Sequence, residues 1–267
     1  MQSFNQLMDA ARTRHLIEVG PGWGQGRTLY GGLTGALLLS HILGLVGHER
    51  VLRSLTVSFV GPVSVGQVEL RGEVLREGKS ALQAEARILQ DGQVCAVMLA
   101  SFGQPRASQI EVSPQHEAPQ VRSVAQSYRI PYVEGLMPEF FQRYDLHWAR
   151  GKPPFAGASE PDFAGWMRFH HEEGEETERI DLPHLVGLVD AWPPSVLPLF
   201  KAPAAASTLT WTLEIIDWPG DMQAQDYWQY NVHTDAAAEG YSHAQAMVWD
   251  KHGNLVAISR QTVAVFA

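Results

Sequence analysis

Apolar and polar residues alternate with a period of two in two separate stretches of the chain. In the first stretch, Leu82 and Ala84 alternate with Gln83 and Glu85. Such regular alternation predicts an antiparallel sheet with one face on a hydrophobic core. The predicted strands cover residues 51–60, 67–75, 80–89 and 94–102 in the first stretch, and 207–213, 227–234, 241–249 and 255–266 in the second. Further strands are predicted over residues 15–20 and 163–170.

An apolar helix is predicted ahead of each group of strands. Residues 32–46 are apolar nearly all round, so this helix must be enclosed on most sides. The second helix is predicted over residues 181–192, with Asp181 as its N-cap and Pro193 just beyond its end. A helix followed by antiparallel strands therefore occurs twice. The two copies differ in that only the second helix carries a carboxylate within its apolar part, Asp190.

This repetition predicts an α+β protein built from an N-terminal module, residues 1–104, and a C-terminal module, residues 161–267. Residues 105–160 are rich in Pro, Gln, Ser and His and have weak periodicity, so we interpret them as an inter-module linker. A helix is expected near residues 138–144. A connection of this length is long for one compact domain, and we expect it to pack across the surface that joins the halves.

The composition indicates a soluble globular protein and excludes several classes of function. Of the 267 residues, 45% are apolar, and the net charge of −9 argues against nucleic-acid binding. The single cysteine, Cys95, excludes an internal disulfide and a multi-cysteine zinc site. No signal peptide is evident and the apolar run at residues 33–46 is too short to span a bilayer, so we expect a cytoplasmic protein without membrane contact. The glycines of residues 20–26 lack the G-x-G-x-x-G spacing, and no metal or cofactor is predicted.

Short motifs follow one another along the first half. Tyr30-Gly31-Gly32 opens the helix, and an R-E-G-K-S turn occupies residues 76–80. Further motifs are Leu55-Thr56-Val57-Ser58-Phe59-Val60-Gly61-Pro62-Val63 and Ala100-Ser101-Phe102-Gly103, with shorter matches at residues 188–191, 207–211 and 259–263. With these motifs the chain resembles the double-hotdog acyl-CoA thioesterases related to bacterial acyl-CoA thioesterase II. The resemblance covers residues 20–103 most specifically.

The resemblance implies a double-hotdog fold, in which each curved antiparallel sheet wraps around a central helix. It implies that the substrate is acyl-CoA, hydrolysed to a free acid and CoA. The acyl chain would lie beside the central helix, and the CoA would lie across the surface. Because pockets in this fold form between modules, the repeat supplies an internal pseudo-dimer. We also expect further self-association into a homodimer or higher homo-oligomer.

The catalytic set of the family is an Asp, a Thr and a Gln on three strands, and this chain matches it in part. The resemblance places the Gln, which helps to bind the attacking water, at Gln261. The position of the Asp reads Ser207 or Thr208, whose hydroxyls orient water but cannot act as a carboxylate base. The position of the Thr falls at Thr234 or Asp235.

Asp190 is the candidate for the missing carboxylate. An Asp in an apolar helix is costly unless it is paired or functional, and burial would raise its pKa and make it a better base. Single-hotdog thioesterases carry an acidic residue at a similar place on the central helix, where it attacks the thioester or activates water. The alternative is a solvent-facing or capping Asp near the helix end that Pro193 terminates.

Two further pairs of residues are candidates for contact with the substrate. Gly31 and Gly32 suit donation of a backbone N–H to the thioester carbonyl, because a helix N-terminus favours developing negative charge. Alternatively, these glycines only allow the helix to approach the sheet. Arg76 and Lys79 stand on a turn and would meet the phosphates of CoA, or else remain solvated.

Three functions remain open at this point. The leading hypothesis is an acyl-CoA thioesterase that uses a carboxylate-activated water or a carboxylate nucleophile. The alternative is a non-catalytic acyl-CoA- or lipid-binding hotdog protein, which the hydroxyl in place of the family's Asp favours. A hydratase or dehydratase would need an Asp/His pair around a helix start, and the sequence offers no clear His partner.

Overall fold

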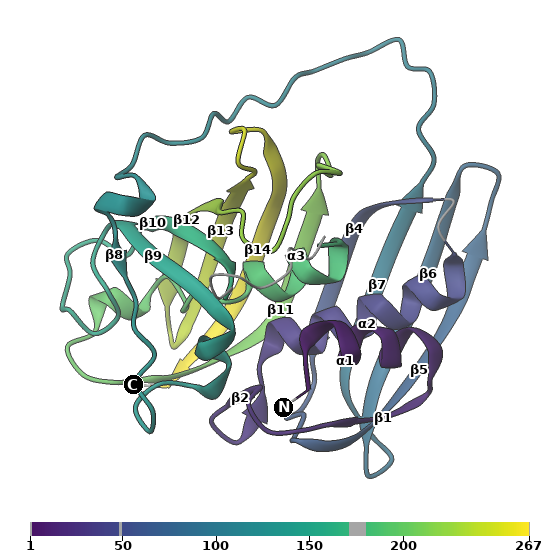
Figure 1. Ribbon diagram of the computed structural model, residues 1–267, viewed down its shortest axis with the longest axis horizontal. Helices are drawn as coiled ribbons and strands as arrows, with labels where there is room; N and C mark the ends of the chain where they lie inside the picture. Colours follow the sequence, from purple (N-terminus) through teal and green to yellow (C-terminus); the bar gives the residue numbers. More distant parts are fainter. Residues whose placement is uncertain (1, 48–49, 171–179, 267) are drawn as a thin grey trace.

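The computed structural model describes residues 2–47, 50–170 and 180–266, which fold around one long antiparallel sheet (Figure 1). The strands of this sheet are β1 (Leu16–Val19), β4 (Val51–Phe59), β5 (Gly66–Glu77), β6 (Ala81–Gln90), β7 (Gln93–Gly103), β8 (Tyr128–Arg129), β9 (Tyr144–Arg150), β10 (Phe163–Phe169), β11 (Ala205–Ile215), β12 (Trp228–Ala238), β13 (Tyr241–Trp249) and β14 (Leu255–Phe266). Their spatial order is β1-β5-β6-β7-β4-β11-β14-β13-β12-β10-β9-β8. The short strands β2 (Gly24–Gln25) and β3 (Thr28–Leu29) pair separately.

In the described residues, three α-helices and three short 3₁₀ helices accompany the strands. The α-helices are α1 (Phe4–Thr13), α2 (Gly31–Val46) and α3 (Leu182–Val189), and the 3₁₀ helices are Val124–Gln126, Glu139–Arg143 and Leu197–Leu199. Helices α2 and α3 pack against each other beside the centre of the sheet (Figure 1). Within the described part of the chain, no helix is both long enough and apolar enough to cross a membrane.

The two halves of the sheet share one topology, as the repeated sequence pattern predicts. In the first half, β1 and α2 precede four strands whose spatial order is β5-β6-β7-β4. In the second half, β10 and α3 precede four strands in the order β12-β13-β14-β11, when both halves are read from the outer side toward the junction. The halves meet where β4 pairs with β11, with Val57 opposite Trp211. The predicted α+β fold with two tandem units is therefore confirmed.

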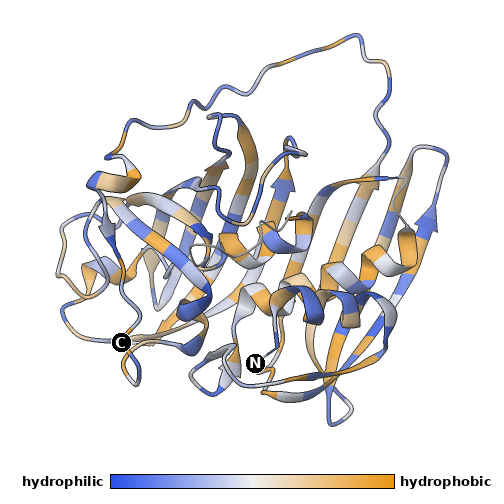
Figure 2. Ribbon diagram, viewed as in Figure 1, coloured by the Kyte–Doolittle hydropathy of each residue, from blue (hydrophilic) through white to orange (hydrophobic). Residues whose placement is uncertain are grey.

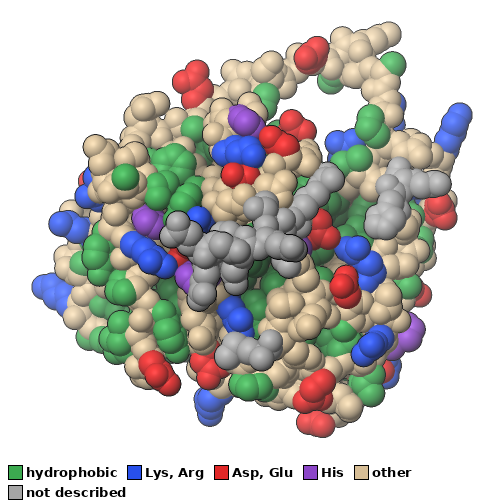
Figure 3. All heavy atoms as spheres, in the orientation of Figure 1, with side chains coloured by type: hydrophobic (Ala, Val, Ile, Leu, Met, Phe, Trp, Pro, Cys, Tyr) green, Lys and Arg blue, Asp and Glu red, His purple; other side chains and the backbone are tan. Residues whose placement is uncertain are grey.

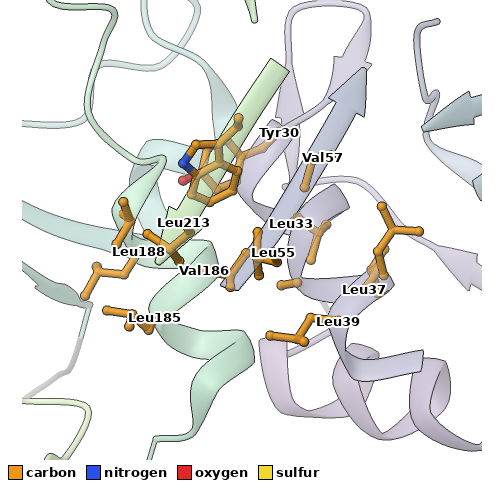
Figure 4. Packing of buried hydrophobic residues seen from close by; sticks show 14 of the residues in the cluster. Tyr30, Leu33, Leu37, Leu39, Leu55, Val57, Leu185, Val186, Leu188 and Leu213 are labelled. Carbon is orange, nitrogen blue, oxygen red and sulfur yellow. The ribbon is translucent and has the colours of Figure 1, made fainter. Parts of the chain in front are cut away.

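The core lies between the helices and the inner face of the sheet. Strand residues on this face, such as Leu55, Val57 and Leu213, are at most 1% exposed. Apolar residues of α2 and α3 lie over β4 and β11 (Figure 4). Apolar and polar residues alternate along the strands, whereas α2 is apolar over most of its length (Figure 2). Removal of this apolar surface from water is the main force that holds the helices on the sheet.

The segment predicted as a linker is irregular only in part. Its residues 105–115 form no helix or strand and arch away from the body of the molecule (Figures 1 and 3). The carbonyls of His116 and Pro119 then accept hydrogen bonds from Trp249 on β13 and Gln229 on β12. The rest contributes β8 and β9, and β9 pairs with β10. The helix expected near residues 138–144 is a 3₁₀ helix, Glu139–Arg143. The sheet of the second half thus includes strands that the weak alternation of this segment did not reveal.

The sequence prediction is wrong for the end of the second helix. Helix α3 stops at Val189, and Asp190 is its C-cap, with φ −82° and ψ 1°. Residues 190–195 then continue as a non-helical segment that contains Pro193 and Pro194. A proline disfavours helical geometry in the residue before it, so the helix has to end ahead of this pair. Asp190 therefore stands at the helix end rather than inside the helix.

Helix α1 was missed by the sequence reading, although its N-terminus carries a clear signal. Ser3 and Gln6 form a capping box, in which each side chain accepts a hydrogen bond from the other residue's backbone N–H. The helix joins the two halves of the core. The hydroxyl of Ser40 in α2 donates to the carbonyl of Met8 at 2.7 Å, and Arg12 forms an ion pair with Asp181 at the start of α3.

Candidate active site

The carboxyl group of Asp190 is held by donors from both halves of the protein. The side-chain amide of Gln261, on β14, donates from Nε2 to Asp190 Oδ1 at 2.7 Å. The backbone N–H of Gly32, in the first turn of α2, also donates to this carboxylate. A helix N-terminus has unpaired N–H groups and a positive dipole end, so it is a suitable partner for a carboxylate. The side chain of Asp190 is partly buried and retains access to solvent.

Burial raises the pKa of Asp190 to about 7, against an ordinary value of 3.8. The main cause is loss of water around the charged form, and the hydrogen bonds from Gln261 and Gly32 lower the pKa by a smaller amount. A carboxyl with this pKa is ionised in about half of the molecules at pH 7. It therefore accepts a proton far more readily than an ordinary Asp does.

Gly31 leaves room for this carboxyl group. A Cβ atom on Gly31 would lie 2.8 Å from Asp190 Oδ2 and 3.5 Å from the ring of Phe59. A Cβ atom on Gly32 would lie 2.5 Å from the ring of Tyr30. Gly31 thus permits the contact between α2 and Asp190, and Gly32 leaves room for the ring of Tyr30. The Gly32 N–H, which the sequence suggested as a donor to the thioester, is engaged with the carboxylate.

Gln261 and Thr234 lie in one row across the inner face of the sheet. Gln261 pairs with Ala244 on β13, and Ala244 pairs with Thr234 on β12. Residues directly opposite each other in an antiparallel sheet share a face, so the Gln261 and Thr234 side chains face the same side. Neighbouring strands are about 4.8 Å apart, which separates the backbones of Gln261 and Thr234 by about 10 Å. In the pairing, Ala244 lies between them.

The pairing also separates the alternatives that the sequence left open. Asp235 occupies a β-bulge beside Thr234 and forms an ion pair with Arg260 at 3.2 Å. Thr208 pairs with Val263, two residues from Gln261, and so shares its face of the sheet. Ser207 pairs with Ala264, and its side chain is exposed on the other face. Of these candidates, the fold brings Thr234 and Thr208 onto the face of Gln261.

Arg76 and Lys79 lie far from this site. Arg76 is near the end of β5, Lys79 is in the turn that follows, and both side chains are exposed. Arg50, just beyond the C-terminal end of α2, donates to the carbonyl of Gly78 in the same turn at 3.1 Å. Helix α2 has 16 residues, which corresponds to a length of about 24 Å. The turn is therefore about a helix length from Asp190.

Two residues of this region were not singled out from the sequence. The buried hydroxyl of Ser195 forms a hydrogen bond with the Thr234 hydroxyl at 2.7 Å. The hydroxyl of Tyr30 donates to the carbonyl of Gly187 in α3 at 2.5 Å, and its ring stacks on Phe140. Burial raises the pKa of Tyr30, so this donor stays protonated. Tyr30 belongs to the Tyr30-Gly31-Gly32 motif at the start of α2. For Ser195, the only local signal is its place after two prolines.

Comparisons with known proteins agree with this architecture. Solved structures of the same fold include a hot dog fold protein from Alicyclobacillus acidocaldarius, with a TM-score of 0.82 and 23% identity over 97% of this chain and 98% of that one. They also include an acyl-CoA thioesterase II from Mycobacterium marinum, with a TM-score of 0.71 and 16% identity over 99% of both chains. The fold is therefore a double hotdog.

The family follows from two family models. The N-terminal domain of acyl-CoA thioesterases matches residues 19–103, and the C-terminal domain of acyl-CoA thioesterases matches residues 111–265. The chain belongs to this acyl-CoA thioesterase family. A search of the curated proteins found no match.

Proposed function

We propose that the protein hydrolyses acyl-CoA thioesters with Asp190 as the general base. The observation that carries this proposal is the Asp190 carboxyl itself, with a pKa raised to about 7 and with Gln261 and Gly32 as its hydrogen-bond donors. A base works best when its pKa is near the working pH, because it is then both available and able to accept a proton. The membership of the acyl-CoA thioesterase family supports the choice of substrate.

In the proposed reaction, Asp190 removes a proton from a water molecule as the water oxygen attacks the carbonyl carbon of the thioester. Gln261 donates its amide N–H to Asp190 and keeps the carboxylate at the sheet face where the water binds. The tetrahedral intermediate then expels the CoA sulfur, which takes the proton from Asp190. The products are the free acid and CoA, and Asp190 is regenerated as a carboxylate.

A turnover assay with a panel of acyl-CoAs tests this function. The panel covers short, long and aromatic acyl groups, and the free thiol of CoA is measured as it is released. We expect turnover of at least one acyl-CoA. Absence of hydrolysis for every member of the panel would contradict the proposal.

The same carboxylate has a second chemical route, in which Asp190 attacks the thioester carbonyl carbon, the C–S bond breaks to release the CoA thiolate, and water then hydrolyses the resulting acyl anhydride at the Asp190 carbonyl. A single turnover in ¹⁸O-labelled water separates the two routes. With Asp190 as base, the label enters only the product acid. Label in the Asp190 side chain, detected by mass spectrometry of its peptide, would show that the carboxylate is the nucleophile.

One observation favours a non-catalytic acyl-CoA-binding protein. Thr208 lies on the face of Gln261, and it supplies a hydroxyl where the resemblance places an Asp. Such a protein would bind a non-hydrolysable acyl-CoA thioether saturably, yet release no thiol from any thioester. The acyl-CoA panel and a titration with the thioether together separate this function from the thioesterase.

A further inference from the structure

The non-helical segment of residues 190–195 contacts the inner face of the sheet at both of its ends. At its start, Asp190 accepts the hydrogen bond from Gln261 on β14. At its end, Ser195 is hydrogen-bonded to Thr234 on β12, with 2.7 Å between the two hydroxyl oxygens. Ala244 of β13 lies between Gln261 and Thr234 in the pairing. The segment therefore bridges the row, and its two prolines restrict its backbone.

The hydrogen bond between Ser195 and Thr234 orients the hydroxyl of Thr234. Ser195 is only 4% exposed, whereas Thr234 keeps partial access to solvent. A hydroxyl has one proton and two lone pairs, so the bond to Ser195 uses one of the bonding positions of Thr234. The remaining positions of Thr234 are then directed away from Ser195, while an unbonded Thr hydroxyl would rotate freely.

The backbone of Thr234 is held as well. The carboxylate of Asp162 accepts a hydrogen bond from the Thr234 N–H at 2.9 Å, at the position where the β-bulge of β12 begins. A bulge re-aims the neighbouring side chain, and a bound backbone N–H keeps that direction constant. With Asp162 on the backbone and Ser195 on the hydroxyl, Thr234 has one well-defined orientation beside Ala244.

We propose that Ser195 is a positioning residue that fixes the orientation of the Thr234 hydroxyl. In this orientation the hydroxyl forms a hydrogen bond with the attacking water or the thioester in the space over Ala244, between Thr234 and Gln261. This inference rests on the proposed hydrolysis. Ser195 itself does not touch the substrate. Its contribution reaches the reaction through Thr234, so removal of either hydroxyl interrupts the same contact.

A double-mutant cycle of Ser195→Ala and Thr234→Val tests the inference, because Val has nearly the shape of Thr without the hydroxyl. Loss of one neutral hydrogen bond predicts a decrease in kcat of about 2- to 10-fold for Ser195→Ala, with KM unchanged. In the Thr234→Val background, Ser195→Ala is expected to cause no further decrease. Ser195→Cys, which fills the cavity left by Ala but donates weakly, should lower kcat like Ser195→Ala.

The fold provides a matched control on the opposite face of the sheet. Thr56 and Thr212 form a similar hydroxyl pair at 3.2 Å, and Thr212→Val should leave kcat and KM unchanged. Thermal unfolding of every variant separates lost positioning from lost stability. Two results would overturn the inference and leave the proposed function intact. One is that the decreases in kcat caused by Ser195→Ala and Thr234→Val multiply in the double mutant, and the other is an unchanged kcat in both Ser195 variants. Absence of hydrolysis in the wild type would overturn the proposed function and the inference with it.

Discussion

One row of paired residues crosses the middle of the sheet and differs in character between the two halves. From the junction of Val57 with Trp211, the row continues in the first half through Met98, Ala86 and Gly72. In the second half, the row continues through Gln261, Ala244 and Thr234. Both halves place Ala in the middle. The first half has an apolar residue or Gly on each side of it, and the second half has a polar side chain on each side.

The helices explain why the polar residues occur only in the second half. Helix α2 packs so closely over the first half of the row that a Cβ atom on Gly72 would lie 2.9 Å from Leu45 and 3.0 Å from His41. A polar side chain there would have no room and would lose its contact with water. Helix α3 has 8 residues against 16 in α2, and it ends at Asp190. In place of a helix, the segment of residues 190–195 supplies a hydrogen-bond partner for each polar side chain in the second half of the row.

Asp190→Asn should have the largest effect on this comparison, because it removes the proposed base from the second half. We expect kcat to fall by about 10²- to 10⁴-fold, as is typical for loss of a general base. Asp181→Asn at the other end of α3 is the control, since Asn also caps helices well, and its activity should stay near that of the wild type. Comparable rates for Asp190→Asn and the wild type would exclude Asp190 as the base.

The same Asp190→Asn protein should gain stability at pH 8. A carboxyl whose pKa is raised by folding binds its proton more tightly in the folded protein, so stability falls as the pH rises from about 4 to 7. Asn carries no such charge. The melting temperature at pH 8 is therefore expected to rise, by about 2–4 °C for each kcal/mol regained, and this rise should vanish near pH 4.

Gly31→Ala should have the next largest effect, because it disturbs the contact of the first half with the Asp190 carboxyl. The added Cβ atom would lie 2.8 Å from Asp190 Oδ2, so the carboxyl has to move. Misplacement of a catalytic group by about 1 Å predicts a decrease in kcat/KM of about 100-fold. Gly61→Ala is the control, because the nearest atom to its Cβ would be 4.0 Å away. Equal activity of the two variants would contradict a steric role for Gly31.

Met98→Gln places, in the first half of the row, the amide that Gln261 supplies in the second half. Met98 is fully buried, so the new amide would lack the partner that Asp190 gives Gln261. We expect a loss of about 1–3 kcal/mol in the free energy of unfolding, measured by urea denaturation. Met98→Leu, which conserves the volume, should cost less than about 1.5 kcal/mol. A Gln variant as stable as the Leu variant would mean that the first half tolerates polar groups equally well.

The pH profile provides the finest comparison. If ionised Asp190 is the base, kcat/KM should be low at pH 5, half-maximal near pH 7 and constant above it. The hydrogen bond from Gln261 lowers the pKa of Asp190, so Gln261→Met should move the midpoint to higher pH. Gln245→Met removes an amide that bonds Arg260 on the outer face and should leave the midpoint unchanged. A shift to lower pH in Gln261→Met would contradict the assigned role of the amide.

Much of the fold follows from local sequence patterns. The alternation in residues 80–89 determines the strand β6 and its buried face, and the apolar run from Leu33 marks α2 as an enclosed helix. Both signals are local, because side-chain direction repeats every 2 residues in a strand and every 3.6 in a helix. Strand β9 escaped prediction although Tyr144, Leu146 and Trp148 alternate with Asp145 and His147, because this alternation is short and lies in a segment that is otherwise rich in Pro, Gln, Ser and His.

The candidate site could be anticipated only by residue type. Asp190 and Gln261 were identified from the sequence, but the hydrogen bond between them joins residues 71 positions apart. Ser195 had no local signal beyond its place after two prolines, because its role depends on Thr234 in β12, which lies two strands away from β14 in the sheet. The choice of Thr234 over Asp235 likewise depends on a β-bulge, which changes the face of a residue without a change in composition.

The sequence by itself determined the repeated order of helix and strands, the burial of α2 and the presence of one carboxylate in the second apolar stretch, because these follow from periodicity and composition over short segments. Only the tertiary structure decided that α3 ends at Asp190, that α2 of the other half donates to the Asp190 carboxylate, and which hydroxyls face Gln261. Those features depend on strand pairing and on the burial of charge between distant segments. Burial also sets the pKa of Asp190, and no local pattern carries that information.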